Sequence, residues 1–404
     1  MLLIIVFLVA SACGDSGNNG DDADALPETV QDPVEAGDDG ALPDPQDEDQ
    51  PPDRIPDPAP DEAPADPPPD MVEDLTPDEL PDGPPVGEWL YTSGHHIYLP
   101  DGSIFHGRGA NLHDTRSCNA CTYMDPNPGE VMRRSDELID TWGANFIRLD
   151  MESYTSSDGY RVHYLGILDD PAYLEDIKEI VAHIADKPGV YVLLSLWVDP
   201  TFNDMGWPTD GTIQIWERLA AEFQDESRLL YGLCNEPENN FDGSQDSEVW
   251  NVMNEAVTAI RAVEDGAGKP HHVIAVQGTG GWSRRLDYYV THPITAGGGE
   301  NIAYEVHVYN PASDFESMWV IPAQTIPVII GEFGPFDSYM ALSDCATLQE
   351  QARGAEVPHL AWTFHMRCDP NLLVENSGGG CGVDMALEAT EWGQLLRTNL
   401  STPW

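Results

Sequence analysis

Positive charge is scarce in this chain. Its 404 residues include 18 Lys and Arg against 71 Asp and Glu, which gives a formal net charge of −53. Because sequence-independent affinity for phosphate backbones comes from Lys and Arg, this deficit excludes nucleic acid as a partner. A neutral substrate, by contrast, meets no such electrostatic penalty.

The apolar run at the N-terminus is short. Residues 1–12, MLLIIVFLVASA, are too few to span a bilayer but match the core of a signal peptide. The end of this run together with the next residue, Ala10-Ser11-Ala12-Cys13, resembles a bacterial lipoprotein processing site, which implies a signal at 1–13 and lipidation of Cys13. No Lys or Arg precedes the run and Ala10 stands where Leu is usual, so an ordinary cleaved signal peptide is the alternative. We expect export: either a lipoprotein of the cell envelope or cell surface, touching the membrane only through its N-terminal anchor, or a secreted protein.

Cysteine is sparse as well. Without Cys13 six of the seven remain, an even number in a compartment expected to be oxidising, which predicts disulfides. They are Cys118, Cys121, Cys234, Cys345, Cys368 and Cys381. The Cys118-x-x-Cys121 spacing could instead begin a zinc site, but no matching second pair exists, so no metal is predicted. Cys234 ends an apolar run and is the candidate for a free thiol, and the sequence leaves the pairing of the others open.

Acidic residues and prolines concentrate in one segment, residues 14–86. This stretch holds 24 of the 71 acids and 17 of the 34 prolines, with Arg54 as its one basic residue. Such a composition cannot bury enough apolar surface to offset the entropy of ordering, and like-charge repulsion extends the chain. We therefore expect a disordered linker that tethers a single large domain at residues 87–404.

The domain at 87–404 alternates strand-like and helix-like segments. A hairpin around the Pro100-Asp101-Gly102 turn is expected at residues 89–111. Eight apolar β-prone runs are found at 104–111, 145–150, 190–197, 229–233, 272–278, 303–309, 327–334 and 359–364. Amphipathic helical patterns lie between them, as at 171–187, 211–226 and 247–265. Eight repeats in about 300 residues favour an α/β fold closed into a (β/α)8 TIM barrel, with an open parallel sheet as the alternative. In a closed barrel the loops after the seventh, eighth and first strands would be neighbours, and disulfides among them would brace the wall of the cleft. These loops contain Cys345, Cys368, Cys381, Cys118 and Cys121.

Polar residues terminate several of these apolar runs. In a parallel barrel the catalytic groups lie at the C-terminal strand ends, where the runs converge. The polar and aromatic residues at those ends are Arg148, Asp150, Asn235, Glu236, His307, Tyr309, Glu332 and Trp362. Two glutamates from separate strands, aimed into one opening, are what retaining glycoside hydrolysis requires.

These motifs resemble glycoside hydrolase family five, the cellulase family of (β/α)8 barrels, over residues 87–404. LCNEPE is similar to the family's Asn-Glu-Pro motif, which implies Glu236 as general acid/base and Asn235 as a ligand of the sugar 2-hydroxyl. IIGEFG is similar to its nucleophile motif, which implies Glu332. The resemblance further implies that Arg148 holds Glu332 ionised, that Tyr309 lies beside that carboxylate and His307 beside the acid/base, and that Trp362 is a sugar platform.

Two tryptophans depart from or extend this pattern. The family usually carries an Asp-x-His pair after the third strand, whereas this chain reads Leu194-Ser195-Leu196-Trp197, so Trp197 is expected to take the place of the histidine. Trp282, after the fifth strand, offers a second flat face for a pyranose. The plainer alternatives are surface carboxylates for the glutamates, a structural core for His307, Tyr309 and Glu305, and core packing for the tryptophans.

The sequence thus predicts a monomeric retaining endo-β-glycosidase that acts on a neutral β-1,4-linked polysaccharide, cellulose or another β-glucan or β-mannan. Internal cleavage follows from the family resemblance alone. The chemistry needs no metal and no organic cofactor. The competing interpretation is a catalytically silent surface lipoprotein that binds carbohydrate through the same barrel.

Overall fold

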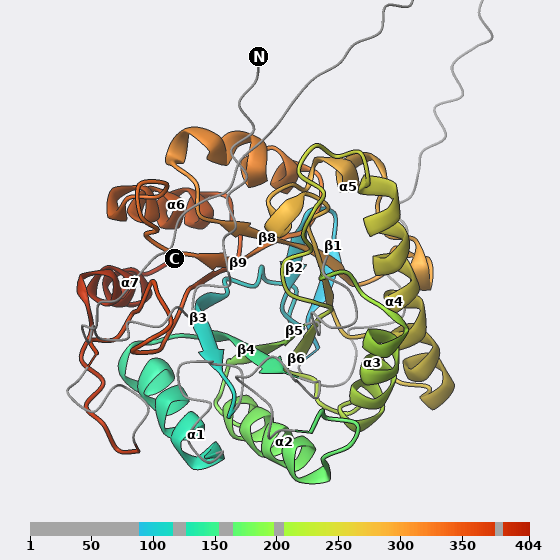
Figure 1. The fold of residues 1–404 in the computed structure, drawn as a ribbon, viewed down its shortest axis with the longest axis horizontal. Helices are drawn as coiled ribbons and strands as arrows, with labels where there is room; N and C mark the ends of the chain where they lie inside the picture. The colour runs from blue at the N-terminus through green and yellow to red at the C-terminus, as the bar shows by residue number, and fades with distance from the viewer. Residues whose placement is uncertain (1–88, 116–126, 153–164, 198–205, 376–382) are drawn as a thin grey trace, which may run out of the picture. The chain divides into compact units, whose positions relative to one another are not determined.

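Eight parallel strands close into a barrel in the order β10-β3-β4-β5-β6-β7-β8-β9 (Figure 1). The computed structural model describes residues 89–115, 127–152, 165–197, 206–375 and 383–404, so the predicted signal and linker segments lie outside the described residues. The strands are β3 (Arg108–His113), β4 (Phe146–Glu152), β5 (Tyr191–Trp197), β6 (Leu229–Gly232), β7 (Ile274–Gln277), β8 (Ile302–Val308), β9 (Val328–Phe333) and β10 (His359–Ala361). This confirms the predicted (β/α)8 barrel over the open sheet.

Helices surround the barrel (Figure 1). They are α1 (Pro128–Asp136), α2 (Pro171–Ala185), α3 (Asp210–Glu222), α4 (Asp246–Ala267), α5 (Asp287–Thr291), α6 (Leu342–Gly354) and α7 (Glu391–Ser401). Between β8 and β9 short helical turns replace a long helix, at η5 (Ala312–Asp314), η6 (Glu316–Val320) and η7 (Pro322–Gln324). None of the helices in the described part of the chain combines the length and apolar character needed to cross a bilayer.

Helix α2 shows how the sequence sets these elements. Asp170 caps its N-terminus by accepting hydrogen bonds from the backbone N–H groups of Ala172 and Tyr173, and Pro171 occupies the first turn, where no N–H is needed. Its buried residues recur at helical spacing, from Tyr173 through Ile177 to Ile184. The helix therefore presents one apolar stripe to the outside of the barrel.

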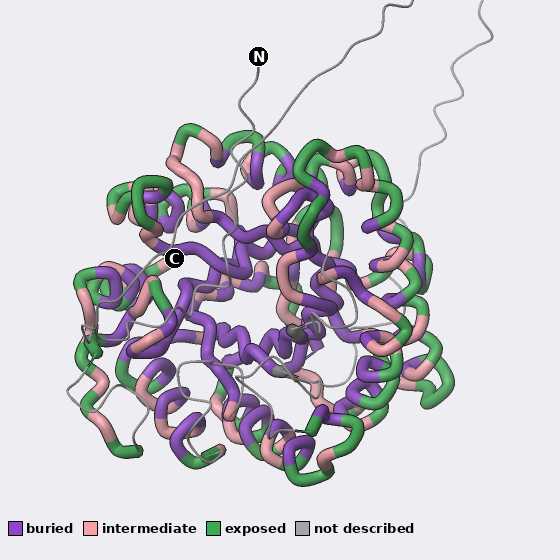
Figure 2. The backbone as a smooth tube through the Cα atoms, viewed as in Figure 1, coloured by how far each residue is buried: buried purple, intermediate pink, exposed green. Residues whose placement is uncertain are grey.

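The strands alternate between two environments. In β4, Ile147, Leu149 and Met151 belong to the core between strands and helices, whereas Phe146, Arg148 and Asp150 occupy the alternate positions. Strand β8 repeats this, with Glu305 and His307 between Tyr304, Val306 and Val308. Figure 2 shows the buried inner ring that results. Polar groups thus enter the barrel near the C-terminal ends of its strands.

An antiparallel hairpin of β1 (Tyr91–Ser93) and β2 (His96–Tyr98) precedes the barrel. This hairpin turns at Gly94, whose φ of 57° is the left-handed conformation that glycine adopts without strain. The turn predicted at Pro100-Asp101-Gly102 is confirmed as a second one: the Gly102 N–H donates to the Leu99 carbonyl, and Tyr98 pairs with Ile104 across the turn in an antiparallel bridge.

The interior of the barrel near the N-terminal ends of its strands is apolar. A separate core cluster joins Leu90, Ile97 and Phe105 to barrel side chains, which are Phe146, Tyr191, Leu193, Leu230, Val273, Ala275, Ala303, Ile329 and Leu360. Phe105 meets Phe146 and Tyr191 edge to face, with ring centroids 5.2 and 5.1 Å apart. These rings fill the end of the barrel where the strands begin, so the opposite end is the one free for chemistry.

The cysteines differ from expectation at one position. Cys234 is a buried free thiol, the state for which it was the candidate, but Cys345 is also buried and free. The expectation that Cys345 lies in a loop, where a disulfide would brace the wall, is wrong, because it lies in the first turn of α6 on the helix face that packs inward. A free Cys234 already implied one further unpaired cysteine, and that cysteine is Cys345. Cys368 is disulfide-bonded, and Cys13, Cys118, Cys121 and Cys381 lie outside the described residues.

Candidate active site

The predicted polar residues converge at the C-terminal end of the barrel. Arg148 lies in β4, His307 near the end of β8 and Glu332 near the end of β9. Asn235 and Glu236 follow β6 by a few residues. Glu236 has a φ of 32°, outside the regions that non-glycine residues normally occupy, so the surrounding structure holds it in place against local strain.

Arg148 is the centre of a buried network. Its Nη1 donates to Glu332 Oε1 and Asp150 Oδ1, both at 2.7 Å, and to Asn111 Oδ1 at 2.8 Å. Its Nη2 donates to Asn235 Oδ1 at 2.8 Å, and its Nε lies 2.9 Å from Glu305 Oε1. Burial opposes the charge of Arg148, but Asp150, Glu305 and Glu332 outweigh it and raise its pKa. One guanidinium therefore balances three buried carboxyl groups.

His307 lies among three glutamates. Its Nδ1 is 2.9 Å from Glu236 Oε1 and 3.5 Å from Glu332 Oε1, and its Nε2 is 3.1 Å from Glu305 Oε1. Burial lowers the pKa of this imidazole, but Glu332, Glu236 and Glu305 together outweigh burial and raise it to about 10. His307 is thus a cation at neutral pH, and both ring nitrogens donate.

The two candidate catalytic carboxyl groups differ in their surroundings. Glu332 has a side chain 6 % exposed and is held from both sides, because Arg148 donates to Oε1 and the Tyr309 hydroxyl donates to Oε2 at 2.9 Å. Glu236 is 27 % exposed, and its hydrogen-bond partner is His307. The first carboxyl group is fixed, whereas the second faces the open side of the site.

Arg148 acts on Glu332 in the expected direction, because it lowers the pKa of that carboxyl group, but other groups act on it as well. Burial raises the pKa of Glu332 and Glu236 adds to the rise, and together they exceed the opposing effects of His307, Arg148 and Tyr309. Arg148 is also shared with Asp150 and Glu305. Burial likewise raises the pKa of Asp150, against the effect of Arg148.

Oxygen atoms of Glu236 and Glu332 and a ring nitrogen of His307 all lie within 4.8 Å of one another. Such a triad has the spacing of a metal site, in which the imidazole would have to be neutral, whereas the glutamates around His307 raise its pKa to about 10. The same spacing suits a retaining glycosidase, whose carboxyl groups stand about 5 to 5.5 Å apart, better than an inverting one, at about 6.5 to 9.5 Å. The geometry therefore favours proton transfer and nucleophilic attack.

The predicted tryptophans occupy three different positions. Trp362 was placed in the eighth strand, but β10 ends at Ala361, and Trp362 follows it with only 6 % exposure and its ring 5.2 Å from that of His113. Trp282 lies in η3 (Gly281–Ser283), where its backbone N–H donates to the Pro237 carbonyl at 2.7 Å, directly beside Glu236. Trp197 ends β5, and its side chain lies outside the described residues.

Several residues of the site were not predicted for it. Glu305 had a signal, because it shares a strand face with His307, but it was considered only as part of a structural core. Asn111, which links Arg148 to the carbonyls of Gly331 and Ala361, lies in a predicted strand and gave no further sign. Phe241 and Arg284, beside Trp282, lie in loops without any motif.

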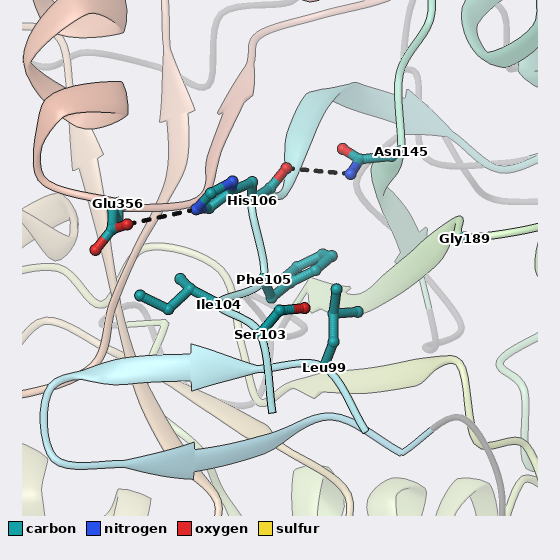
Figure 3. A pocket seen from close by; sticks show the side chains of 8 residues that line it. All are labelled: Leu99, Ser103, Ile104, Phe105, His106, Asn145, Gly189 and Glu356. Atoms are coloured by element: carbon teal, nitrogen blue, oxygen red, sulfur yellow. Dashed lines mark hydrogen bonds and ion pairs between the residues drawn. The ribbon is translucent and has the colours of Figure 1, made fainter. Parts of the chain in front are cut away.

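The opposite end of the barrel has a pocket of its own. It measures about 410 Å³ and is lined by residues that precede strands: Leu99, Ser103, Ile104, Phe105, His106, Asn145, Gly189 and Glu356 (Figure 3). There the Asn145 amide donates to the His106 carbonyl at 3.1 Å, and His106 faces Glu356. None of the site residues described above lines this pocket, so it is distinct from the catalytic end.

Known proteins match both the sequence and the fold. Endoglucanase A of Butyrivibrio fibrisolvens is 26 % identical over 255 residues, 62 % of this chain and 52 % of that protein. An endoglucanase of Clostridium saccharobutylicum is 30 % identical over 172 residues, 43 % of this chain and 34 % of that protein. This chain therefore spans about half or less of these two relatives.

Solved structures share the fold at lower identity. The catalytic domain of an endoglucanase from Thermobifida fusca superposes with a TM-score of 0.59 at 18 % identity, covering 78 % of this chain and 97 % of that one. A β-mannanase from Thermomonospora fusca does so with a TM-score of 0.56, also at 18 % identity and with the same coverage. The family model described as cellulase, glycosyl hydrolase family 5, matches residues 105–366. Because this match covers more than half of the chain, the chain belongs to glycosyl hydrolase family 5.

Proposed function

We propose that this protein is a retaining endo-β-glycosidase that cleaves β-1,4-linked glucan or mannan. The observation that carries the proposal is the approach of Glu236 and Glu332 to within 4.8 Å, with His307 bridging them. Family membership supports it, as do the names of the relatives, which are endoglucanases, and of one fold neighbour, a β-mannanase.

The surroundings of the two carboxyl groups divide their roles. Glu332, fixed by Arg148 and Tyr309, attacks the anomeric carbon with its carboxylate while the bond from that carbon to the bridging oxygen breaks. Glu236 gives its proton to the departing oxygen. A water then gives its proton to Glu236 and attacks the glycosyl-enzyme, which frees the sugar with retained configuration and restores both groups.

His307 favours the products of the first step. Once Glu236 has lost its proton, the Nδ1–H of His307 donates to a full carboxylate instead of a neutral acid. The ionised carboxylate adds a direct Coulomb attraction to the positively charged imidazole, and this attraction is several-fold stronger in a low-dielectric site than in water. The interaction therefore strengthens as the proton moves, which is the condition for lowering a barrier.

The test is reducing-sugar release by the full chain from β-glucans and β-mannans, with Glu332→Gln and Glu236→Gln as variants. Removing either carboxyl group is expected to lower kcat by about 10³-fold or more, because neither step has a substitute group. Glu356→Gln is the matched control, since it removes a carboxylate at the other end of the barrel and is expected to leave turnover unchanged. A rapid fall in polymer viscosity relative to sugar release checks internal cleavage.

The same experiment separates the competing interpretation. A silent carbohydrate-binding protein would retain polysaccharide on a column but release no sugar from any polymer. It would also show no difference between the wild type and the two glutamine variants. Either result would remove the catalytic proposal.

We further propose that the protein is exported and anchored through a lipid on Cys13, with residues 14–86 as an acidic tether. The support is the sequence alone: the apolar run at 1–12, the small residues before Cys13 and the Asp/Pro-rich composition. Mass spectrometry of the N-terminal peptide tests this. A lipid mass on Cys13 is expected in the wild type, and an unmodified N-terminus beyond Cys13 would indicate a secreted protein instead.

A further inference from the structure

Arg284 follows η3 on the loop after β7, beside the loop that carries Glu236. Two backbone hydrogen bonds tie these loops together, from Trp282 N–H to the Pro237 carbonyl at 2.7 Å and from Gly281 N–H to the Asn240 carbonyl at 3.0 Å. Because Glu236 is the group proposed to protonate the leaving oxygen, this loop borders the leaving-group side of the cleft. Arg284 is therefore placed near the sugar that departs first.

The guanidinium of Arg284 lies over an aromatic ring and not against a carboxylate, although Glu236 acts on its charge without forming an ion pair. Its carbon Cζ lies 4.8 Å from the centroid of the Trp282 ring, and it makes no hydrogen bond or ion pair within the described part of the chain. The next residue shows the contrast, because Arg285 donates to Asp246 at 2.8 Å and lies 3.8 Å from Asp287. A half-buried charge without a partner is costly, and here it persists in a chain with 71 acidic and 18 basic residues.

The groups that face Arg284 belong to the catalytic end. Burial lowers the pKa of Arg284, and the charged or titratable groups that act on it are Glu236, Tyr309 and Tyr339. Tyr309 donates to Glu332, and Tyr339 has 49 % of its surface exposed. The guanidinium is thus within electrostatic reach of the proposed acid/base and of Tyr309, which contacts the proposed nucleophile.

Aromatic rings complete the surroundings. Phe241, 57 % exposed, meets Trp282 at 4.8 Å in a tilted, nearly edge-on arrangement. Trp282 and Ser283 both have φ in the left-handed region, 57° and 56°, which costs free energy that the rest of the loop must supply. The loop therefore holds Trp282 and Arg284 in one arrangement before any ligand arrives.

We propose that Arg284 and Trp282 form an anion-binding subsite for a carboxylate carried by the leaving-group part of the substrate. The ligand class is a β-glycan that bears uronic acid or other carboxyl substituents. The guanidinium lies over the Trp282 ring, and its N–H groups, which make no hydrogen bond within the described residues, are available to donate to a carboxylate in bidentate fashion. This inference rests on the proposed function, because it names a substrate feature of the same site.

The charge of the domain makes such a subsite consequential. A strongly acidic surface repels an anionic polymer at long range, although salt screens this repulsion beyond about 8 Å at physiological ionic strength. An unpaired guanidinium in the cleft supplies the local attraction that a carboxyl-bearing sugar needs. A neutral sugar hydroxyl would gain less from it, because it carries no opposite charge for the guanidinium to attract.

The experiment compares carboxymethyl cellulose with hydroxyethyl cellulose, which share one backbone and differ in charge. For the full chain, Arg284→Gln is expected to lower kcat/KM about tenfold on the carboxymethyl polymer and less than about twofold on the neutral one, the loss of one charge-assisted contact. Arg284→Lys should recover part of the loss. Arg397→Gln, which removes an exposed arginine on α7 that lies over Trp142, is the matched control and should change neither value.

Other outcomes overturn the inference. Equal losses on both polymers would make Arg284 a contact for any sugar, and no loss on either would mean that it does not touch substrate. If the wild type cleaves neither polymer, the glucan part of the proposed function fails while its mannan part does not, and binding then decides the subsite: calorimetry with cello-oligosaccharides and their C6-oxidised counterparts should show a preference for the oxidised form that Arg284→Gln abolishes. Absence of that preference in the wild type would refute the subsite.

Discussion

At the C-terminal end of the barrel His307 lies between three glutamates, whereas at the N-terminal end His96 and His106 lie on either side of one. The Nε2 atoms of His96 and His106 are 3.8 and 3.7 Å from the two oxygens of Glu356. Burial lowers the pKa of both imidazoles despite Glu356, but the pKa of His307, which is more deeply buried, rises to about 10. The direction therefore depends on the carboxylates and not on burial alone.

The difference lies in how the carboxylates are solvated. Glu356 is 40 % exposed, so water screens its charge from both histidines. Glu305 is fully buried and Glu332 is 6 % exposed, and both lie closer to their imidazole. Charges in a low-dielectric interior interact several-fold more strongly than at the surface. Histidine and glutamate thus form a buried, strongly interacting charged site at the C-terminal end of the barrel and a weakly interacting surface cluster at the N-terminal end.

Replacing one arginine at each end of the barrel is the strongest test of this comparison. Arg148→Met would leave Asp150, Glu305 and Glu332 buried without their cation, and we expect it to lower the free energy of unfolding by about 3–5 kcal/mol. Urea denaturation monitored by circular dichroism measures this value.

Arg108→Met is the matched variant at the N-terminal end. Arg108 donates to the carbonyls of Asn399 and Thr402, at 2.8 and 2.9 Å, and neutralises no carboxylate there. Its loss should cost about 1–3 kcal/mol, the penalty for unsatisfied neutral acceptors. Equal destabilisation by the two variants would contradict the view that the two ends differ in buried charge.

The two ends should also respond to pH with opposite sign. The pKa of His307 is higher in the folded state than the ordinary value of 6.5, so its contribution to stability is complete below pH 6.5 and is lost as pH rises toward about 10. For this buried group the loss is of the order of a few kcal/mol. The pKa values of His96 and His106 are lowered, so their effect is a loss of stability as pH falls below 6.5.

Thermal unfolding midpoints between pH 5 and pH 10 test these signs. In His307→Gln the decline between pH 6.5 and 10 should flatten relative to the wild type, and in His106→Gln the decline below pH 6.5 should shrink. The His106 effect is the smaller one because that side chain is 34 % exposed. A His307 variant that keeps the alkaline decline of the wild type would show that other groups cause it.

Local patterns predicted the barrel because its strands are short apolar runs and most of them are separated by helices. The strand ends were less accurate: the run at 359–364 stops at Ala361, where the chain leaves the sheet. The helix expected between the sixth and seventh strands is replaced by short turns at 312–324. Such limits depend on packing against neighbouring elements, which no local window contains.

The sequence predicted which residues form the site but not how they are hydrogen-bonded and paired with one another. Asn235, Glu236 and Glu332 follow strands and carry motifs, so their positions could be predicted. The sharing of Arg148 among three carboxyl groups could not, because Glu305 and Glu332 lie 157 and 184 residues away in the chain. Arg284 and Arg285 make the same point, since these adjacent arginines occupy opposite environments, one without an acidic partner and one with two.

The smallest expected effect concerns Glu356, whose φ of 57° places a non-glycine residue in the left-handed region. Glu356→Gln removes the charge but keeps this strain, while Glu356→Gly removes both. Relieving the backbone strain should stabilise the folded state by about 1–2 kcal/mol. Glycine also gives the unfolded chain more conformational freedom, which cancels about 0.5–1 kcal/mol of that gain. We therefore expect the glycine variant to be more stable than the glutamine variant by up to about 1 kcal/mol, measured by urea denaturation near neutral pH.

The weak ion pairs from Glu356 to His96 and His106 are lost in both variants. The difference between their free energies of unfolding therefore does not include those ion pairs. A glutamine variant as stable as the glycine variant would mean that the N-terminal end carries no strain, and a loss of polysaccharide turnover in either would break the separation between the two ends.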